Sequence, residues 1–192
     1  YFLPWHRQLL YEFETALRRF APVTIPYWDW TKPIPGSGLL VNQKFSLDPV
    51  WARMGGASGG NIPSSPFLNW WTNIPSIHNV QRQFTVGSNT PYAFVSRANL
   101  DVLTRSRADD FSTFSTYLEA VHGSPHVAVG GDMQIVSQSP NDPMFWSHHA
   151  FVDKIWSEWQ LSGGNGNAFG GTHNNPIREV CLDCERMAPL QF

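Results

Sequence analysis

The chain has 192 residues and a mass of 21.7 kDa, a size that suits one domain with its own hydrophobic core rather than two. Its 13 Lys and Arg against 15 Asp and Glu give a formal net charge of −2, which argues against the broad basic surface that nucleic acid or anionic lipid requires. No apolar run reaches the roughly 18 residues of a membrane span, and the first residues lack the order of a signal peptide. We therefore expect one domain over residues 1–192 without a nucleic-acid or membrane partner. The compartment stays open, with a secreted or extracellular location slightly favoured.

Four helices are predicted, because apolar residues recur at every third or fourth position in four stretches of the chain. These stretches cover about residues 4–20, 93–104, 111–128 and 144–161. Pro4 suits a first-turn position, whereas Pro125 predicts a break in the third helix near Gly123. Shorter helical turns are predicted over 49–54 and 77–84. The fold class that follows is mainly α, with an antiparallel four-helix bundle as its core and long irregular loops around it.

The 15 glycines and 15 prolines predict long loops, above all over residues 31–92 and in an irregular tail over 163–192. The tail contains Cys181 and Cys184 as a single Cys-x-x-Cys, without the second pair that a zinc tetrad needs. A local disulfide, two idle thiols and a catalytic dithiol all remain open for this pair. The two histidines in these loops are interpreted as surface or structural residues: His78 and His173.

Four of the seven histidines lie where the predicted helices point side chains toward the core, and the first of them is His6. His122 and His126 are four residues apart, which places both imidazoles on one helix face, as a single metal ion needs. His149 adds a third nitrogen from the next helix, and Asp153, one turn further on, could orient that helix or a ligand ring. Three imidazoles without a competing cysteine or carboxylate suit copper, zinc or iron.

The sequence around these histidines resembles the tyrosinase and polyphenol oxidase family, whose members hold a type 3 pair of copper ions. Residues 2–7, Phe-Leu-Pro-Trp-His-Arg, resemble the family's copper A motif, and residues 26–30, Pro-Tyr-Trp-Asp-Trp, resemble the segment that follows it. Residues 122–133 contain His-x-x-x-His and Gly-Gly-Asp-Met, and residues 140–153 contain Pro-Asn-Asp-Pro-Met-Phe-Trp-Ser-His-His. Together these two segments resemble the copper B motif. The middle of the chain and its tail carry no motif of the family.

The resemblance implies a role for each histidine in these motifs. His6 matches the third ligand of copper A, and the copper B ligands are matched by His122, His126 and His149. His148 matches a neighbouring histidine that is not a ligand and lines the entrance of the site. The family's other two copper A histidines lie upstream of the Phe-Leu-Pro-Trp-His-Arg motif. We therefore expect a fragment that completes copper B but not copper A, with a separate N-terminal segment as the partner that completes copper A.

The family resemblance also implies the reaction, in which two copper ions and dioxygen oxidise a phenolic substrate. Such enzymes convert o-diphenols to o-quinones, and full tyrosinases add a monooxygenase step on monophenols, the chemistry of melanin biosynthesis. In the family, a Glu shortly before the first copper B histidine and an Asn directly after it hold a water that acts as the base. Glu119 matches the Glu but Gly123 replaces the Asn, so we expect strong o-diphenol oxidation and weak monophenol hydroxylation. Three residues match positions that line the substrate pocket, with ordinary packing as the alternative for each: Met133, Val136 and Phe145.

Other readings of the same residues remain open. The oxygen-carrying haemocyanin units of molluscs resemble this family in the same copper motifs, and an inactive, single-copper or zinc-loaded remnant is a third alternative. Zinc hydrolysis is disfavoured because Glu119 is the only positioned base. Arg7 and Glu14 are interpreted as a structural pair on or near the first helix, and the aromatic residues 27–30 as a wall of the core.

Overall fold

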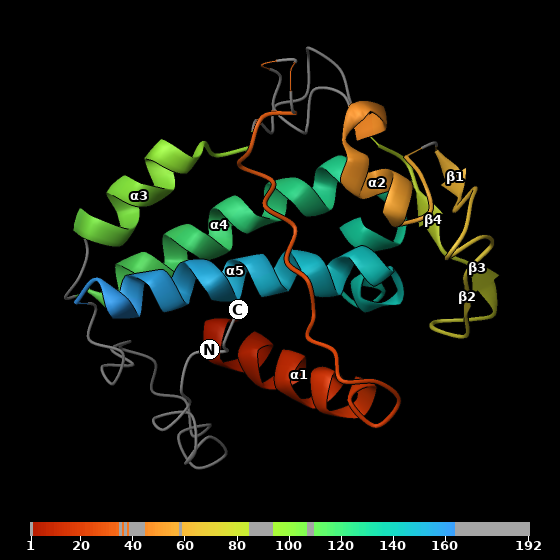
Figure 1. Cartoon of the computed structure of the whole chain (residues 1–192), viewed down its shortest axis with the longest axis horizontal. Helices are drawn as coiled ribbons and strands as arrows, with labels where there is room; N and C mark the ends of the chain where they lie inside the picture. Colours follow the sequence, from red (N-terminus) through yellow and green to blue (C-terminus); the bar gives the residue numbers. More distant parts are fainter. Residues whose placement is uncertain are drawn as a thin grey trace. The chain divides into compact units, whose positions relative to one another are not determined.

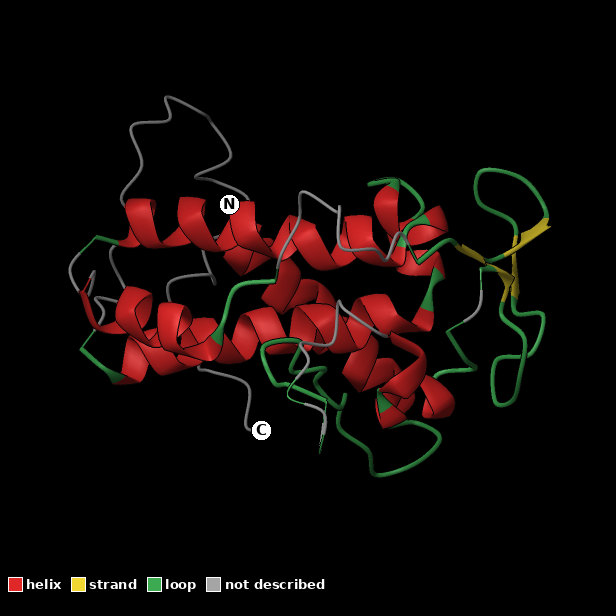
Figure 2. Ribbon diagram, turned by 90° about the horizontal axis from the view of Figure 1, so that it is seen from above, coloured by secondary structure: helices red, strands yellow, loops and turns green. Residues whose placement is uncertain are grey.

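The computed structural model describes residues 2–34, 36, 38, 45–57, 59–84, 94–106 and 110–163. Its four longer helices are α1 (Phe2–Leu17), α3 (Arg97–Ser106), α4 (Phe111–Val129) and α5 (Pro143–Leu161), and a short α2 covers Pro49–Arg53 (Figure 1). The short strands are β1 (Gly60–Asn61), β2 (Trp71–Thr72), β3 (His78–Asn79) and β4 (Gln81–Arg82). Single 3-10 turns form η2 (Phe45–Leu47), η3 (Gly131–Gln134) and η4 (Ser139–Asn141). The predicted mainly α fold class is confirmed, since helices dominate the described chain (Figure 2).

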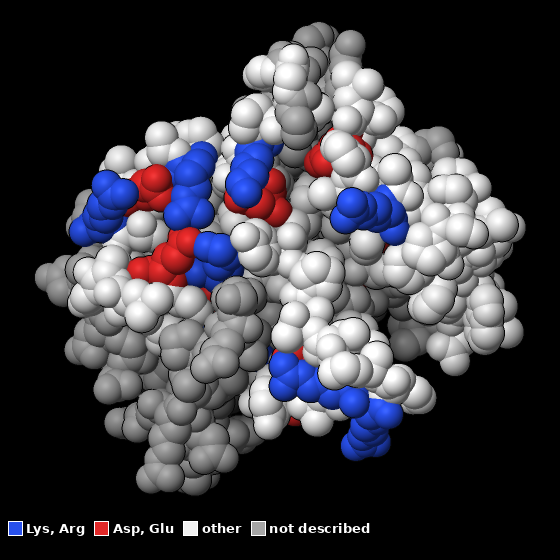
Figure 3. Space-filling model, viewed as in Figure 1, with Lys and Arg blue, Asp and Glu red and all other residues white. Residues whose placement is uncertain are grey.

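The chain packs as two compact units, each described here by itself. The first unit consists of Tyr1–Pro26, Ala98–Ala120 and His149–Phe192, and the second of Tyr27–Arg97 and Val121–His148. The predicted single domain over residues 1–192 stays a prediction. Among the described residues, no helix has the length and apolar character needed to cross a bilayer. On the face shown in Figure 3, acidic side chains lie among the basic ones.

The first unit is built on the second half of α5, which contacts the three other long helices. Phe114 of α4 stacks on Trp159 of α5 with ring centroids 4.7 Å apart, and the Ser162 hydroxyl just after α5 donates to the Thr104 carbonyl of α3. Near the other end of α4, in the second unit, His126 meets Phe145 at the start of α5. These two contacts show that α4 and α5 are antiparallel, as predicted for the bundle.

Helix α4 differs from the expected break near Gly123, because it is continuous from Phe111 to Val129 with Pro125 inside it. A proline removes only its own N–H from the helical ladder and crowds one preceding carbonyl. The buried side chains of Phe114 and Leu118 before the proline, and of Val129 after it, hold the helix on both sides of this one lost bond. The prediction of a break was therefore wrong.

The second unit contains the short strands and a cluster of buried aromatic rings. Trp28 meets Trp51 edge to face at 5.3 Å, and Trp28 and Trp30 are at most 1% exposed. The expectation that residues 27–30 form a wall of the core is therefore confirmed for the two tryptophans, whereas Tyr27 is 39% exposed. The predicted turn over 49–54 is helix α2, started by Asp48, whose carboxylate accepts from the Val50 amide.

The helical turn predicted over 77–84 was wrong, because this segment forms β3 and β4. Strand β3 pairs with β2, and β4 pairs with β1, both antiparallel. Val80, Arg82 and Phe84 are buried whereas Gln83 between the last two is exposed. This alternation has the period of two that a strand requires, and it could have been read from the sequence.

Candidate metal centre

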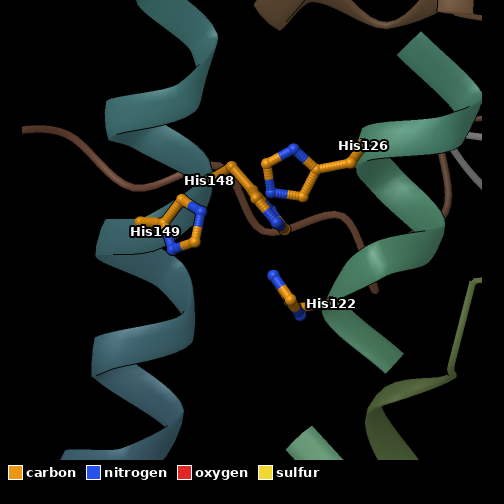
Figure 4. A group of neighbouring side chains, drawn as sticks. All are labelled: His122, His126, His148 and His149. Atoms are coloured by element: carbon orange, nitrogen blue, oxygen red, sulfur yellow. The ribbon is translucent and has the colours of Figure 1, made fainter. Parts of the chain in front are cut away.

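Four histidines from α4 and α5 lie together, as Figure 4 shows. One ring nitrogen of each can be chosen so that all four atoms lie within 4.8 Å of one another. The group consists of His122, His126, His148 and His149. Helix α4 supplies the first two because residues four apart share a face, and α5 supplies two consecutive residues. A donor set made only of imidazoles is one that copper accepts readily, so the residues present fit a copper site.

Three of these histidines belong to the second unit and pack ring against ring. The ring of His126 meets His122 at 5.2 Å and His148 at 4.6 Å, both nearly perpendicular. The rings of His122 and His148 are parallel within 8° and 5.7 Å apart. His148 is 0% exposed and also touches Trp28 and Trp30. The structure therefore places His148 inside the cluster, which differs from the entrance position expected for it.

The ring of His126 is held in one orientation by its Nδ1 atom. This atom lies 2.8 Å from the Met133 carbonyl oxygen, and because a carbonyl only accepts, Nδ1 carries the proton. The other nitrogen, Nε2, then keeps its lone pair for a metal. Burial lowers the pKa of His126 below its ordinary value of 6.5, although the Met133 hydrogen bond and the charge of Asp142 oppose the shift. A neutral ring at neutral pH is the form that binds a metal ion.

In the first unit, His6 of α1 stacks on His149 of α5. The two rings are parallel within 3° and their centroids are 4.0 Å apart. The Nδ1 atom of His6 donates to the Phe2 carbonyl oxygen at 2.8 Å, which again leaves Nε2 with its lone pair. Among the described residues, His6 is not part of the four-histidine group. Its assignment to copper A stays a prediction, and the geometry shows that it adjoins a predicted copper B ligand.

A buried ion pair joins the same two helices one residue beyond His6 and one turn beyond His149. Arg7 Nε lies 2.5 Å from Asp153 Oδ1, with side chains 0% and 2% exposed. Burial raises the pKa of Asp153 and lowers that of Arg7, while the attraction between the two opposes both shifts. The expected pairing of Arg7 with Glu14 was wrong, because the two residues are seven positions, about two turns, apart on α1 and Arg7 pairs with Asp153. Glu14 instead pairs with Arg18 and accepts from the Ile25 amide.

The other predicted site residues have different surroundings. Glu119 is exposed on α4, one turn before His122. A Cβ added to Gly123 would meet nothing within 4 Å. Among the three predicted pocket residues, Met133 and Phe145 are buried, at 1% and 3% exposed, and Val136 is 92% exposed. Phe145 lies with its ring edge on His126, and Met133 supplies the carbonyl that orients the same ring. Their roles toward a substrate stay predictions.

Three predicted features lie outside the described residues: Cys181, Cys184 and His173.

Sequence reasoning missed a second buried ion pair that holds the start of α5. Arg82 donates from Nε and Nη2 to the two carboxylate oxygens of Asp142, both at 2.7 Å, and both side chains are 0% exposed. Asp142 also accepts from the Met144 amide at 2.8 Å, which makes it the N-terminal cap of α5. The signal for the cap was present, because an aspartate before Pro143 is typical of a helix start. Nothing in the sequence indicated its arginine partner 60 residues away.

Residues 1–162 match the family description "Common central domain of tyrosinase". The chain is 33% identical over 181 residues to a tyrosinase of Streptomyces antibioticus, an alignment that covers 83% of this chain and 62% of that protein. It is 30% identical over 237 residues to oxidase hkm6 of Aspergillus hancockii, covering 96% of this chain and 83% of that protein. Hemocyanin 1 of Megathura crenulata is 32% identical over 167 residues, covering 81% of this chain and 4% of that protein. The chain spans about three fifths of the length of the Streptomyces tyrosinases that it matches.

The family match includes both helices that carry the histidine cluster, and the cluster itself is a donor set that fits a copper site. Motif, fold and site therefore agree, and this chain belongs to the tyrosinase family of copper oxidoreductases.

Proposed function

We propose that this chain takes part in the copper-dependent oxidation of phenols by dioxygen, with o-diphenols as substrates and o-quinones as products. The observation that carries the proposal is the group of four histidines on α4 and α5, in a chain of the tyrosinase family. His122, His126 and His149 would hold one copper ion, and His6 would contribute to a second. Copper supplies the electron transfer between phenol and dioxygen, which no side chain of the site can perform.

The chain's own residues prepare the site for this chemistry. The hydrogen bonds from Nδ1 of His6 and His126 to backbone carbonyls fix the rings before any metal binds, so less order is lost on binding. The low pKa of His126 keeps its ring neutral, so no proton has to leave before the nitrogen coordinates. The buried ring of Phe145 against His126 excludes water from one side of that ligand.

Monophenol hydroxylation is proposed to be slow, because the base that removes the phenol proton is incomplete. We assign Glu119 to hold the water that accepts this proton. Its exposed side chain on α4 is open to solvent. At Gly123 no amide side chain is present to polarise that water. Gly123→Asn is therefore expected to raise the monophenol rate relative to the diphenol rate. Gly123→Ala, which adds carbon without an amide, is the matched control, and an equal ratio in both variants would contradict this assignment.

The proposed activity is tested on the full chain by counting copper ions per chain and by measuring catechol oxidation under oxygen. We expect one copper ion per chain at the predicted copper B ligands, and catechol oxidation once the segment that completes copper A is supplied. Both should be lost in His122→Ala and in His126→Ala. The exposed Tyr11→Phe on α1 serves as the control and should change neither. A wild-type chain that binds copper but oxidises no catechol with that segment present would contradict the proposal.

A second candidate function is reversible dioxygen binding, favoured by the similarity to hemocyanin 1. The two functions differ in what happens to a phenol. A carrier gains and loses its absorption band as oxygen is added and removed, and it leaves catechol unchanged. Catechol consumption in the experiment above would decide for the enzyme.

A further inference from the structure

His78 of β3 lies between the two copper motifs in the sequence, and both of its ring nitrogens are engaged. Nδ1 is 2.7 Å from the Ser76 carbonyl oxygen, and Nε2 is 2.9 Å from Asp132 Oδ1. A carbonyl oxygen and a carboxylate both accept hydrogen bonds. Both contacts are therefore hydrogen bonds only when both ring nitrogens carry a proton, which makes His78 a cation in this arrangement.

Asp132 is the buried partner of this cation, at 3% exposed. Its Oδ1 also accepts from the side-chain amide of Asn141 at 3.0 Å, and its Oδ2 accepts from the backbone amide of Gln81 at 2.8 Å. Three donors from β3, β4 and η4 thus converge on one carboxylate in η3. A buried carboxylate needs such donors and a balancing charge, and His78 is the only charged group among the three.

Turn η3 connects Asp132 to the metal centre, because it contains both Asp132 and the residue that orients His126. Asp132 is followed by Met133, whose carbonyl oxygen accepts from Nδ1 of His126. The hydroxyl of Ser139 lies 3.0 Å from the same Nδ1 atom. The position of the Met133 carbonyl therefore decides which nitrogen of His126 carries the proton and which faces the metal.

The contact between β4 and η3 is too close to absorb a shift. A Cβ on Gly131 would lie 2.0 Å from the Gln81 carbonyl oxygen, so only glycine allows this approach. The same segment is also tied to the end of α4, because the amides of Gln83 and Phe84 donate to the Val129 carbonyl. These backbone bonds do not involve His78, so β4 should stay folded when the His78 side chain is removed. The change then falls on Asp132 and on the Met133 carbonyl that follows it.

We propose that His78 is a positioning residue for the metal-binding histidine His126, acting through Asp132 and the Met133 carbonyl. This proposal depends on the proposed function, because it assumes that His126 is a copper ligand. Groups that orient a metal-binding histidine typically contribute about 10-fold to 100-fold to metal affinity. We expect the loss of the His78 ring to weaken copper binding by about 10-fold.

The test measures which ring nitrogen of His126 carries the proton, in the full chain without metal. Nitrogen-15 spectra of the histidine rings report which nitrogen carries the proton. In the wild type we expect His126 to be protonated on Nδ1, and in His78→Ala to become a mixture of the two forms. His78→Gln, whose amide can still donate to Asp132, should restore the Nδ1 form, and copper affinity measured by competition titration should follow the same order.

Asn79→Ala is the matched control, because Asn79 lies on the same strand and its side chain donates to the Asn69 carbonyl instead. It should leave the ring of His126 and the copper affinity at wild-type values. Unchanged spectra and copper affinity in His78→Ala, with only a lower melting temperature, would overturn the proposal and leave His78 a structural residue. If His78→Ala does not fold, the comparison moves to His78→Asn, whose shorter amide does not reach Asp132, against the longer His78→Gln. Equal spectra of His126 in those two variants would then overturn the proposal.

The failure of the proposed function would give a different result. A wild-type chain that binds no copper, but in which the His126 ring still responds to His78, would contradict the copper function and support the positioning role. A chain that binds copper with an affinity independent of His78 would support the copper function and contradict the positioning role.

Discussion

Among the described residues, each of the two units contains one buried Arg–Asp pair, and the two pairs have different numbers of hydrogen-bond partners. In the second unit, Arg82 and Asp142 share two hydrogen bonds, and the remaining nitrogen of Arg82 donates to the carbonyls of Met54 and Gly56. In the first unit, Arg7 makes one short bond to Asp153. The second carboxylate oxygen of Asp153 is buried and has no hydrogen-bond partner among the described residues.

Other side chains of α5 satisfy the rest of the Arg7 guanidinium. The guanidinium of Arg7 lies over the Trp156 ring at 3.7 Å and donates to Gln160 and Ser157. All of these partners lie on α5, so the pair fixes one helix against another beside His6. The pair of the second unit instead ties strand β4 to the start of α5. One unit therefore uses a buried ion pair to align two helices, and the other uses one to hold a short strand against a helix start.

The largest effect is expected from Asp142→Ala, which breaks the better satisfied pair. The change strands the buried Arg82, at a cost of about 3 kcal/mol, and removes the cap of α5, at a cost of about 1 kcal/mol. Urea unfolding should therefore show a loss of about 4 kcal/mol in the free energy of unfolding. Asp48→Ala, which removes the cap of α2 but no ion pair, is the control and should cost about 1 kcal/mol. Equal losses in the two variants would show that Arg82 contributes nothing.

The pair of the first unit is expected to respond differently to single and double replacement. Arg7→Met leaves Asp153 buried without its cation and should cost about 3 kcal/mol. The double variant Arg7→Met with Asp153→Leu removes both charges and fills the space with apolar atoms, so its stability should lie within about 1 kcal/mol of the wild type. Thermal and urea unfolding of both variants measure this difference. A double variant as unstable as the single one would show that the ion pair itself stabilises the unit.

The close approach in the second unit predicts an intermediate effect for Gly131→Ala. The new Cβ would collide with the Gln81 carbonyl, and the residue has a φ of +57°, so the loss should be about 2 to 3 kcal/mol. Gly60→Ala is the matched control, because Gly60 has a φ of +97° with open space around it, and only the backbone penalty of about 1 kcal/mol applies. If the two variants unfolded at the same urea concentration, the contact between β4 and η3 would not be as tight as the structure has it.

Features set by local spacing could be predicted from the sequence, whereas pairings between distant residues could not. The four long helices, the bundle and the ring positions of His122 and His126 follow from spacing along one helix, which a sequence displays directly. Arg7 could be recognised as structural, but its partner on α5 could not, because side chains 146 residues apart meet only through tertiary packing. His78 is the clearest case. The sequence predicts only a surface or structural histidine in a loop. The fold brings its ring to Asp132, next to the residue whose carbonyl orients His126.

The smallest effect is expected from pH, and it concerns His78. Its hydrogen bond to Ser76, with a further contribution from the bond to Asp132, raises its pKa above the ordinary value of 6.5. A group whose pKa is higher in the folded than in the unfolded chain stabilises the fold fully below the unfolded value, and this contribution disappears as the pH rises through the folded value. The difference in melting temperature between the wild type and His78→Gln should therefore shrink from about pH 6 upward. A difference that stays constant over this range would mean that His78 is not charged in the folded protein, and that its contact with Asp132 does not depend on the second proton.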